Sequence, residues 1–437
     1  NNKMHDIESL YEIFRQFPNI TIDSRCCPPE SLFFALKGKN NDGNRFAEKA
    51  LQNGAEYAVI DDPDVAAGDR YIVVPDVLTA MQQLAAHHRR QMKARIIAVT
   101  GTNGKTTTKE LIATVLAKQY KVLYTERNHN NHIGVPLTLL RLTEEDQFGV
   151  IEMGANHKGE IASLCDIAQP DFGIITNFGR AHLEGFGSFE GVIEAKTELF
   201  DYLREHKGRV FINIGNSNIV EKAKGIGNIS YGINNDKADV SGYITGQSPC
   251  ISVSWASQRF FVVAQSVKTH LVGGYNLENL LAAVVAGLFF EVEPNDINEA
   301  LCGYIPENHR SQYMKTDHND LIIDAYNANP SSMAAALRNF NSLPYPHKMV
   351  ILGDMLEMGD TAVEDHEEIV NILRNQLSID EVLLVGEIFA GIDSGYKTFV
   401  TVDDLSAYLE ANPPKDTAVL LKGSNGIGLE RIIAYLK

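Results

Sequence analysis

The chain has 437 residues, 44% of them hydrophobic, which favours two or three packed domains. Its net charge of -17 argues against binding to nucleic acid, because a phosphate backbone is bound by Lys and Arg clustered on one face. The five cysteines show neither a CxxC pair nor metal-ligand spacing, which favours a reducing cytoplasm over a disulfide framework. The longest apolar run, residues 280–290, is too short to cross a bilayer, and no basic-then-apolar leader opens the chain. We therefore expect a cytoplasmic protein without membrane insertion.

The first part of the chain alternates short apolar strands with helical stretches and ends in a helix-like run over residues 78–92. This pattern predicts a small α/β domain over residues 1–93. An apolar strand, a Gly-rich turn, a helix over residues 106–119 and further strands then predict a mostly parallel sheet, in a central domain over residues 94–310. The alternating residues 251–265 predict an antiparallel hairpin laid against this sheet.

The last part of the chain resumes the alternation of strand and helix, with about 25 residues between successive strands. It predicts a separate Rossmann-like domain over residues 311–437. The expected fold class is α/β with three domains: a small N-terminal domain, a central P-loop domain with a parallel sheet, and a C-terminal Rossmann-like domain. We expect the functional sites to lie between these domains.

The strongest motif is TGTNGKTT at residues 100–107, between an apolar strand and a helix. Its glycines let backbone N–H groups face phosphate oxygens, and the helix start adds about half a positive charge. Val99 stands where the standard Walker pattern has Gly, so a chance Gly-rich turn is the alternative. The strand and helix in register favour a nucleotide site, whose predicted residues are Gly101, Thr102, Asn103, Gly104, Lys105 as a mobile cation, Thr106 as a hydroxyl for Mg²⁺, and Thr107.

This loop resembles the ATP loop of Mur ligases and folylpolyglutamate synthases, which form amide bonds through acyl phosphates. Further motifs in chain order resemble the Mur ligases over nearly the whole chain: NNHIGVPLTLL (130–140), EMGANHKGEI (152–161), TNFGRAHLEGFGS (176–188), IDAYNANPSSM (323–333), LGDMLEMG (352–359) and LLKGSNGIGLE (420–430). The resemblance implies an ATP-dependent ligase with two Mg²⁺ ions that acts on UDP-N-acetylmuramoyl-tripeptide and D-alanyl-D-alanine. We expect it to act as a monomer.

The resemblance also implies a catalytic set of Lys105, Glu152, His182 and Lys196. Glu152 ends a predicted strand, where ligands of an open α/β sheet gather, and its carboxylate suits Mg²⁺. With Thr106 it would hold the first Mg²⁺, whereas a surface or helix-capping Glu is the alternative. His182 would bind a second Mg²⁺, and Lys196 would be carbamylated and serve the same metal. Read alone, the two would be an ordinary histidine and a solvated helix lysine.

Four more residues are implied to bind ATP. Asn276 and Asn279 lie in a segment that resembles the family's adenine-contacting segment, although Tyr275 stands where the family has His; both asparagines could equally be helix N-caps. Arg310 resembles an arginine that reaches the ATP phosphates, with an ordinary linker charge as the alternative. Asp324 ends a predicted strand and would lie near the ribose or a Mg²⁺-bound phosphate.

The substrate contacts implied by the resemblance fall mostly at the two ends of the chain, with Asn131 in the central domain. Polar turns near the N-terminus would hold the UDP-linked substrate, and the YNANP stretch would lie near the incoming dipeptide, although each is also ordinary turn chemistry. The predicted substrate residues are Ser24, Arg25, Lys37, Asp42, Asn131, Tyr326, Asn327 and Asn329.

Two rival functions remain open at this point. A neighbouring ligase, which adds the third residue of the peptide, has a similar N-terminal domain and ATP loop, but its usual DNPR-type motif does not occur in this sequence. A P-loop switch that binds nucleotide without forming a bond is the rival from another class.

Overall fold

The computed structural model describes residues 5–307 and 309–437, which form two compact units. The first unit holds the described residues up to 99, with residues 120–155 and 159–173. The second holds residues 100–119, 156–158 and the described residues from 174 onward. Three sheets follow one another along the described chain, each with its own helices, and the predicted α/β class with three domains is confirmed.

The N-terminal sheet is parallel, in the order β1-β2-β3-β4. Helix α1 begins after Asp6, whose carboxylate accepts from Ser9 N at 2.9 Å, and it buries Leu10 and Phe14 along one side. The predicted helix near residues 78–92 is confirmed as α3. The elements are α1 (Ile7–Gln16), β1 (Asn19–Thr21), β2 (Ser31–Phe34), α2 (Ala47–Gln52), β3 (Ala55–Ile60), β4 (Tyr71–Val73) and α3 (Val77–Gln91).

The central sheet has the order β13-β12-β11-β10-β9-β8-β5-β7-β6. Strands β5, β6 and β7 pair in parallel, as do β9, β10 and β11. The strands are β5 (Arg95–Thr100), β6 (Val122–Tyr124), β7 (Phe148–Glu152), β8 (Phe172–Ile175), β9 (Arg209–Asn213), β10 (Gly227–Ile233), β11 (Val240–Gln247), β12 (Cys250–Ser257) and β13 (Val262–Val272).

The predicted hairpin is present as β12 and β13, which pair antiparallel. Its expected placement was wrong, because the hairpin extends the main sheet instead of lying against it. Strand β11 makes this possible: it pairs in parallel with β10 on one side and antiparallel with β12 on the other, so that one hydrogen-bonded ladder continues to the edge.

Helix α10 is apolar on nearly all sides and lies buried against α4 and strands β9, β10 and β11. Its burial places the start of α10 beside the start of α4, where the P-loop ends. The helices of the central domain are α4 (Lys105–Leu116), α5 (Gly134–Leu139), α6 (Glu160–Ala168), α7 (Leu183–Phe186), α8 (Phe189–Glu205), α9 (Ser217–Lys222), α10 (Asn276–Phe289) and α11 (Pro294–Gly303). None of the helices described in this chain is long and apolar enough to span a membrane.

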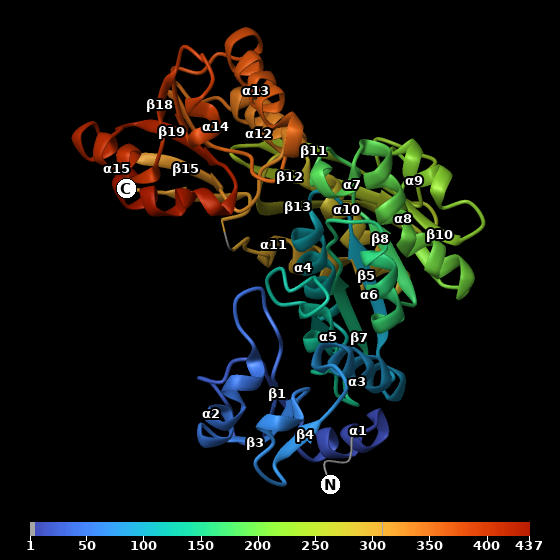
Figure 1. Ribbon diagram of the computed structural model, residues 1–437. Coiled ribbons are helices and arrows are strands. Elements are labelled where there is room, and N and C mark those ends of the chain that lie inside the picture. Colours follow the sequence, from blue (N-terminus) through green and yellow to red (C-terminus); the bar gives the residue numbers. More distant parts are fainter. Residues whose placement is uncertain (1–4, 308) are drawn as a thin grey trace. The chain divides into compact units, whose positions relative to one another are not determined.

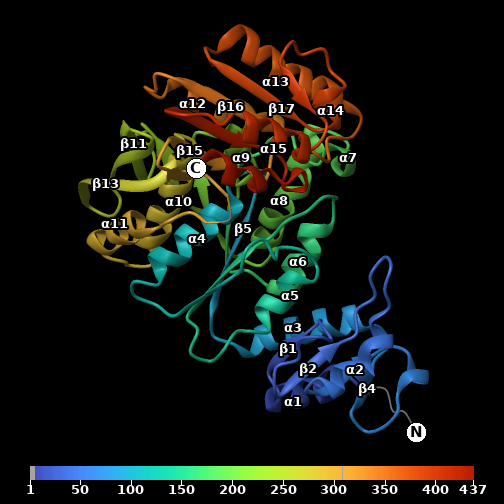
Figure 2. The same ribbon diagram turned by 90° about the vertical axis from the view of Figure 1, so that its left-hand side faces the viewer.

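The C-terminal sheet has the order β14-β15-β19-β16-β17-β18, with only β14 antiparallel to its neighbour. Helices α12 and α13 pack on one face and α15 on the other (Figures 1 and 2), which is the layering of a Rossmann-like domain. The elements are β14 (Gln312–Lys315), β15 (Asn319–Asp324), α12 (Pro330–Ser342), β16 (Lys348–Gly353), α13 (Ala362–Gln376), β17 (Glu381–Val385), α14 (Glu387–Ala390), β18 (Lys397–Phe399), α15 (Val402–Ala411) and β19 (Thr417–Lys422).

Candidate active site

The Gly-rich loop joins β5 to α4, as the sequence predicts, and two of its glycines have no room for a side chain. Gly101 has φ +144°, and a Cβ there would lie 1.9 Å from Thr176 Oγ1. Gly104 has φ +79°, and a Cβ there would lie 2.7 Å from Asn279 Oδ1. The backbone of the loop therefore has a fixed path that only glycine permits, with its N–H groups at the start of a helix.

The segment after β8 holds the loop in place. Thr102 N donates to Asn177 O at 3.0 Å, and Asn103 N donates to Asn177 Oδ1 at 2.9 Å. Asn177 Nδ2 donates a hydrogen bond to Asn103 O at 3.1 Å, and Gly179 N donates to Thr102 Oγ1 at 2.9 Å. Asn177 thus shapes the loop, a role that the sequence does not reveal although the residue lies within the quoted motif 176–188.

The backbone path of the loop sets the positions of its side chains. Lys105 Nζ donates to Gly101 O at 2.9 Å and to Thr102 O at 3.1 Å, so the ammonium lies over the loop. Thr106 and Thr107 are buried in the first turn of α4. Backbone N–H groups, a lysine and a threonine hydroxyl are thereby gathered where a phosphate and its metal would bind.

Two further predicted residues lie within electrostatic reach of Lys105. Lys196 is only 3% exposed, and burial together with the charge of Lys105 holds the pKa of its amine well below the usual range. Burial and Lys105 also lower the pKa of His182, and Lys196 adds to that effect. The centre of the Phe186 ring lies 5.5 Å from Lys196 Nζ and 6.5 Å from the centre of the His182 ring. The reading of Lys196 as a solvated helix charge was wrong.

This cluster, Lys105, His182 and Lys196, has a clear chemical preference. Groups that can carry positive charge repel one another, most strongly where one of them, here Lys196, is buried, and an anion or the loss of a charge relieves that repulsion. The arrangement therefore fits a polyphosphate. It also fits conversion of the Lys196 amine to an anion.

His182 has a partner that sequence reasoning missed. Its Nδ1 lies 2.7 Å from Oε2 of Glu357, which belongs to the motif 352–359 in the C-terminal domain. The charge of Glu357 opposes the lowering of the His182 pKa. The backbone of His182 is left-handed, with φ +51°, a conformation that non-glycine residues rarely adopt.

Glu152 is 1% exposed at the end of β7, so the reading as a surface carboxylate was wrong. Its Oε1 accepts from Asn130 Nδ2 at 2.7 Å, and its backbone N donates to Thr125 Oγ1 at 2.9 Å. Glu152 belongs to the first compact unit and Thr106 to the second, and their shared Mg²⁺ stays a prediction. Asn131 is exposed, and its Oδ1 accepts from Ile133 N and Gly134 N at the start of α5.

Asn276 and Asn279 link the loop to the C-terminal domain. Thr108 Oγ1 donates to Asn279 Oδ1 at 3.0 Å, and Asn279 Nδ2 donates to Asn276 Oδ1 at 3.0 Å. Asn276 Nδ2 then donates to Val272 O at 2.8 Å and to Ser311 Oγ at 3.2 Å. Both asparagines lie inside α10 and are buried, so the N-cap alternative was wrong; contact with adenine stays a prediction.

Arg310 lies in the linker to the C-terminal domain, where its guanidinium stacks 3.6 Å from the centre of the Tyr326 ring. Its neighbours His309 and Ser311 have φ +57° and +47°, so the linker backbone is strained on both sides of it. The structure thus brings together Arg310, which is predicted to bind ATP, and Tyr326, which is predicted to bind the dipeptide. This stacking distinguishes Arg310 from a simple solvated charge.

Asp324, at the end of β15, is paired with a buried lysine that sequence reasoning did not name. Lys422 Nζ donates to Asp324 Oδ2 at 2.7 Å and to Asn327 O at 3.1 Å, and Lys422 is 1% exposed. Asp324 and Lys422 are register partners on neighbouring parallel strands. The pair ties the strand end to the loop that carries Tyr326 and Asn327.

Asn329 caps α12 and contacts the P-loop. Its Oδ1 accepts from Ser332 N at 2.9 Å, and its Nδ2 donates to Asn103 Oδ1 at 2.7 Å. Asn103 Nδ2 also donates to Ser331 Oγ at 3.4 Å. Asn329, which is predicted to bind the dipeptide, thus contacts Asn103, which is predicted to bind ATP. Contact of Asn329 with a dipeptide stays a prediction.

The predicted residues of the N-terminal domain lie in two local clusters. Arg25 donates three hydrogen bonds to Asp23, two from its guanidinium and one from its backbone N, which lower the pKa of Asp23 to about 2. Ser24 O accepts from Asn53 Nδ2 at 2.7 Å. In the second cluster, Lys37 Nζ lies 2.8 Å from Asp61 Oδ1. Asn44 donates there to both Asp42 and Asp61 at 2.8 Å. These contacts hold the predicted residues in place, and their binding of UDP stays a prediction.

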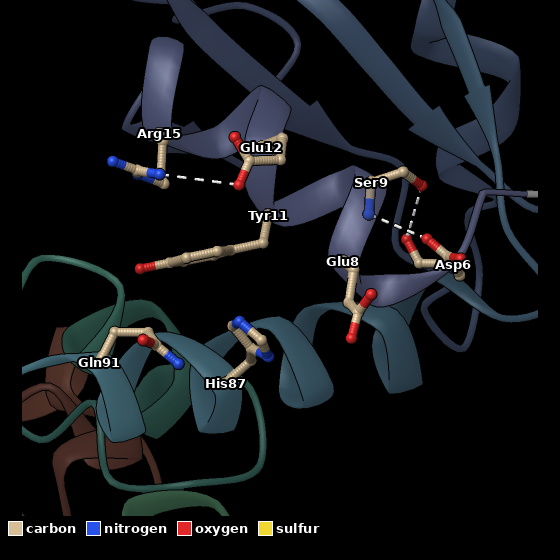
Figure 3. A pocket seen from close by; sticks show the side chains of 8 residues that line it. All are labelled: Asp6, Glu8, Ser9, Tyr11, Glu12, Arg15, His87 and Gln91. Carbon is tan, nitrogen blue, oxygen red and sulfur yellow. Dashed lines mark hydrogen bonds and ion pairs between the residues drawn. The ribbon is translucent and has the colours of Figure 1, made fainter.

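A surface hollow of about 570 Å³ lies between α1 and α3 of the N-terminal domain (Figure 3). The Tyr11 ring from α1 lies against the His87 ring from α3, with ring centres 4.5 Å apart, and Glu12 pairs with Arg15 beside them. The residues predicted for the substrates and for ATP lie elsewhere, so this hollow is separate from the candidate site. Its lining residues are Asp6, Glu8, Ser9, Tyr11, Glu12, Arg15, His87 and Gln91.

The parallel sheet, the glycine-restricted loop and the cationic cluster define a P-loop protein that binds a nucleotide phosphate. Family comparison adds the particular class. Residues 16–89 match the catalytic domain of the Mur ligase family, residues 99–287 the Mur ligase middle domain, and residues 309–425 the glutamate ligase domain of Mur ligases. The chain belongs to the Mur ligase family.

Curated relatives match along nearly the whole chain. The UDP-N-acetylmuramoyl-tripeptide–D-alanyl-D-alanine ligase of Bacillus subtilis (strain 168) is 37% identical, over 95% of this chain and 92% of its own. The Escherichia coli (strain K12) protein of the same name is 32% identical, over 96% and 93%. A crystal structure of MurF from Acinetobacter baumannii has a TM-score of 0.86 at 31% identity, covering 96% of this chain and 93% of that one. The MurF ligase from Thermotoga maritima, at 24% identity and a TM-score of 0.84 over 99% and 98%, shares the fold.

The first prediction concerns Lys105. Lys105→Ala is expected to lower the turnover of ATP by about a hundredfold or more, because the cation neutralises phosphate charge during transfer. The chain should remain folded, since two hydrogen bonds to loop carbonyls contribute only about 0.5–1.5 kcal/mol each. Lys118→Ala is the matched control, because Lys118 lies just beyond α4 and pairs with Glu299. Turnover and thermal unfolding are measured together, and near-normal turnover of Lys105→Ala would contradict the phosphate site.

The second prediction separates the two contacts of Asn329. Asn329→Ser keeps an N-cap for α12 but cannot reach Asn103, whereas Asn329→Ala loses both contacts. We expect both variants to raise the KM for ATP by roughly two- to tenfold, as loss of one hydrogen bond implies. Only the alanine variant should also lose about 1 kcal/mol of unfolding free energy. A serine variant with the wild-type KM for ATP would show that the Asn103 contact has no role in nucleotide binding.

Proposed function

We propose that the chain is an ATP- and Mg²⁺-dependent ligase that joins D-alanyl-D-alanine to UDP-N-acetylmuramoyl-tripeptide. The product is the UDP-linked muramoyl pentapeptide used in peptidoglycan synthesis, made in the cytoplasm by a monomer. The observation that carries the proposal is the interaction of Lys105 in the P-loop with His182 and with the buried Lys196. Relatives that match at least 95% of the chain and are named for this activity support it.

The chemistry begins with transfer of the ATP γ-phosphate to the terminal carboxylate of the tripeptide. The free amine of D-alanyl-D-alanine then attacks the acyl phosphate, forms the amide bond and expels phosphate. Lys105 and the loop N–H groups neutralise charge and hold the phosphates in line. Because an exposed acyl phosphate would hydrolyse, contact of the C-terminal domain with the loop through Asn103 and Asn329 supports exclusion of water.

The donor chemistry of the chain fits two Mg²⁺ ions. Thr106 and Glu152 would hold one, since a hydroxyl and a buried carboxylate are the oxygen ligands that Mg²⁺ prefers. His182 and carbamylated Lys196 would hold the other. Among the described residues no group of three His, Cys, Asp or Glu could hold a metal, so hydroxyl, carbamate and phosphate oxygens would have to complete these sites. When bound, Mg²⁺ supplies charge neutralisation to the transferring phosphoryl group.

The burial of Lys196 supports its carbamylation. A carbamate forms when a neutral amine attacks CO₂ and releases a proton, so a lowered amine pKa promotes the reaction. Burial and the nearby Lys105 lower that pKa. The product replaces a cation that repels Lys105 with an anion that attracts both Lys105 and Mg²⁺.

The remaining roles divide among the three domains. Residues 1–93 would bind the UDP-linked substrate through Ser24, Arg25, Lys37 and Asp42, with Asn131 from the central domain. Residues 94–310 would bind ATP through the loop, Asn276, Asn279 and Arg310. Residues 311–437 would add Asp324 at the nucleotide and hold the dipeptide through Tyr326, Asn327 and Asn329.

The test of the reaction is release of phosphate with each substrate omitted in turn. We expect release from ATP only when UDP-muramoyl-tripeptide and D-alanyl-D-alanine are both present, with the pentapeptide confirmed by mass. Release with a UDP-linked dipeptide and a diamino acid would support the neighbouring ligase instead. Release that needs no peptide substrate would support a P-loop switch.

The test of the carbamate uses ¹³CO₂. We expect a carbamate carbon signal that is present in the wild type, absent in Lys196→Ala, and present in Lys224→Ala, a control at an exposed lysine on the surface. Lys196→Ala should lose about 10- to 100-fold in rate, as loss of a metal-supporting group implies, and formate or acetate should restore part of it. Lys196→Arg should gain nothing, because its fixed cation fills the same space. Full activity of Lys196→Ala without added carboxylate would exclude the carbamate.

A further inference from the structure

The contact between His182 and Glu357 joins two domains within one compact unit. His182 follows β8 in the central domain, and Glu357 follows β16 in the C-terminal domain. The atoms in contact are Nδ1 of the imidazole and Oε2 of the carboxylate, 2.7 Å apart. Glu357 is itself 64% exposed, so the pair is not a buried ion pair that holds the fold together.

The loop that presents Glu357 is firmly anchored at its start. Asp354 is buried, and its carboxylate accepts from Ile388 N at 2.8 Å and from Phe389 N at 2.9 Å. Met355 N donates to Nε2 of the fully buried His366 at 2.9 Å. The LGDMLEMG motif therefore builds a rigid base in the C-terminal domain, from which Glu357 reaches outward.

The end of the loop packs directly on the segment that carries His182. The 3₁₀ helix Gly359–Thr361 contacts α7, and a Cβ on Gly359 would lie 3.2 Å from Glu184 Cβ. Glu357 and Gly359 both have φ +63°, and His182 has φ +51°. Left-handed residues on both sides of one contact indicate that surrounding packing, and not local preference, fixes the geometry of the pair.

The chemistry of this pair concerns the two nitrogens of the imidazole. A carboxylate can accept a hydrogen bond only from a protonated nitrogen, so Glu357 favours the tautomer with the proton on Nδ1. Nε2 then keeps its lone pair. A carboxylate that accepts from one nitrogen while the other faces a metal is the usual outer-shell arrangement of histidine ligands.

We propose that Glu357 is a positioning residue that fixes the tautomer and ring orientation of His182 from the C-terminal domain. The proposal rests on the metal-ligand role proposed above for His182. It assigns the C-terminal domain a part in preparing the phosphate site of the central domain. The site is complete only while the two domains are in contact at this loop.

The direct test is imidazole ¹⁵N NMR of the full chain without nucleotide or metal, with the His182 signals assigned by their loss in His182→Gln. We expect the wild type to show His182 protonated on Nδ1. In Glu357→Ala the signals should shift toward protonation on Nε2, the form that free imidazole side chains favour in water. Glu367→Ala, at an exposed residue of α13 in the same domain, should leave them unchanged. A His182 tautomer that is the same in wild type and Glu357→Ala would overturn the proposal.

A second measurement distinguishes positioning from a structural role. Binding of Mn²⁺ in the presence of ADP should weaken by about tenfold or more in Glu357→Ala, as expected for loss of an outer-shell partner. The melting temperature should stay close to that of the wild type. Unchanged Mn²⁺ affinity, or a loss of affinity that follows a lower melting temperature, would contradict the proposal.

Neither readout needs a peptide substrate. The proposed ligase reaction would fail if phosphate release by the wild type did not depend on D-alanyl-D-alanine. That failure is therefore distinguishable from failure of the Glu357 proposal.

Discussion

The constraint on which the site depends is the repulsion of Lys196, which is buried, and of His182 by the positive charge of Lys105. Burial and Lys105 lower the pKa of both Lys196 and His182, which disfavours positive charge on these two groups, while Glu357 opposes the effect at His182. The same repulsion gives the site its preference for phosphate. It would also favour reaction of the Lys196 amine with CO₂, so nucleotide binding and the proposed carbamate would share one electrostatic cause.

That cluster is held by elements that are distant in sequence. Asn177, after β8, fixes the loop that carries Lys105, and Asn279, from α10, fills the space beside Gly104. The C-terminal domain adds Asn329 at Asn103 and Glu357 at His182. Two side chains of that domain thus touch residues of the proposed phosphate site. Contact between the domains is thereby linked to the geometry of the chemistry.

The linker between these domains carries strain in the same region. Arg310 stacks on Tyr326 between two left-handed residues, and Ser311 meets both Asn276 and Asp324. Asp324 is in turn neutralised by the buried Lys422. A hydrogen-bonded path therefore runs from Thr108, beside the loop, through the two asparagines of α10 to the end of β15. Movement of the C-terminal domain would have to break part of this path.

The sequence by itself determined the α/β class, some of the helices and parallel strands, and the position of the loop, because hydrophobic periodicity and glycine spacing are local signals. It also named Lys105, Glu152, His182 and Lys196, through a family resemblance carried by motifs in chain order. It misplaced the β12–β13 hairpin, since apolar alternation does not reveal that β11 will pair with β12. It allowed a solvated Lys196 and capping roles for Asn276 and Asn279, because burial and hydrogen-bond partners depend on residues far away in the chain. Only the tertiary structure decided that Asn177, Lys422 and Glu357 support the site, because each acts on a partner at least 74 residues away.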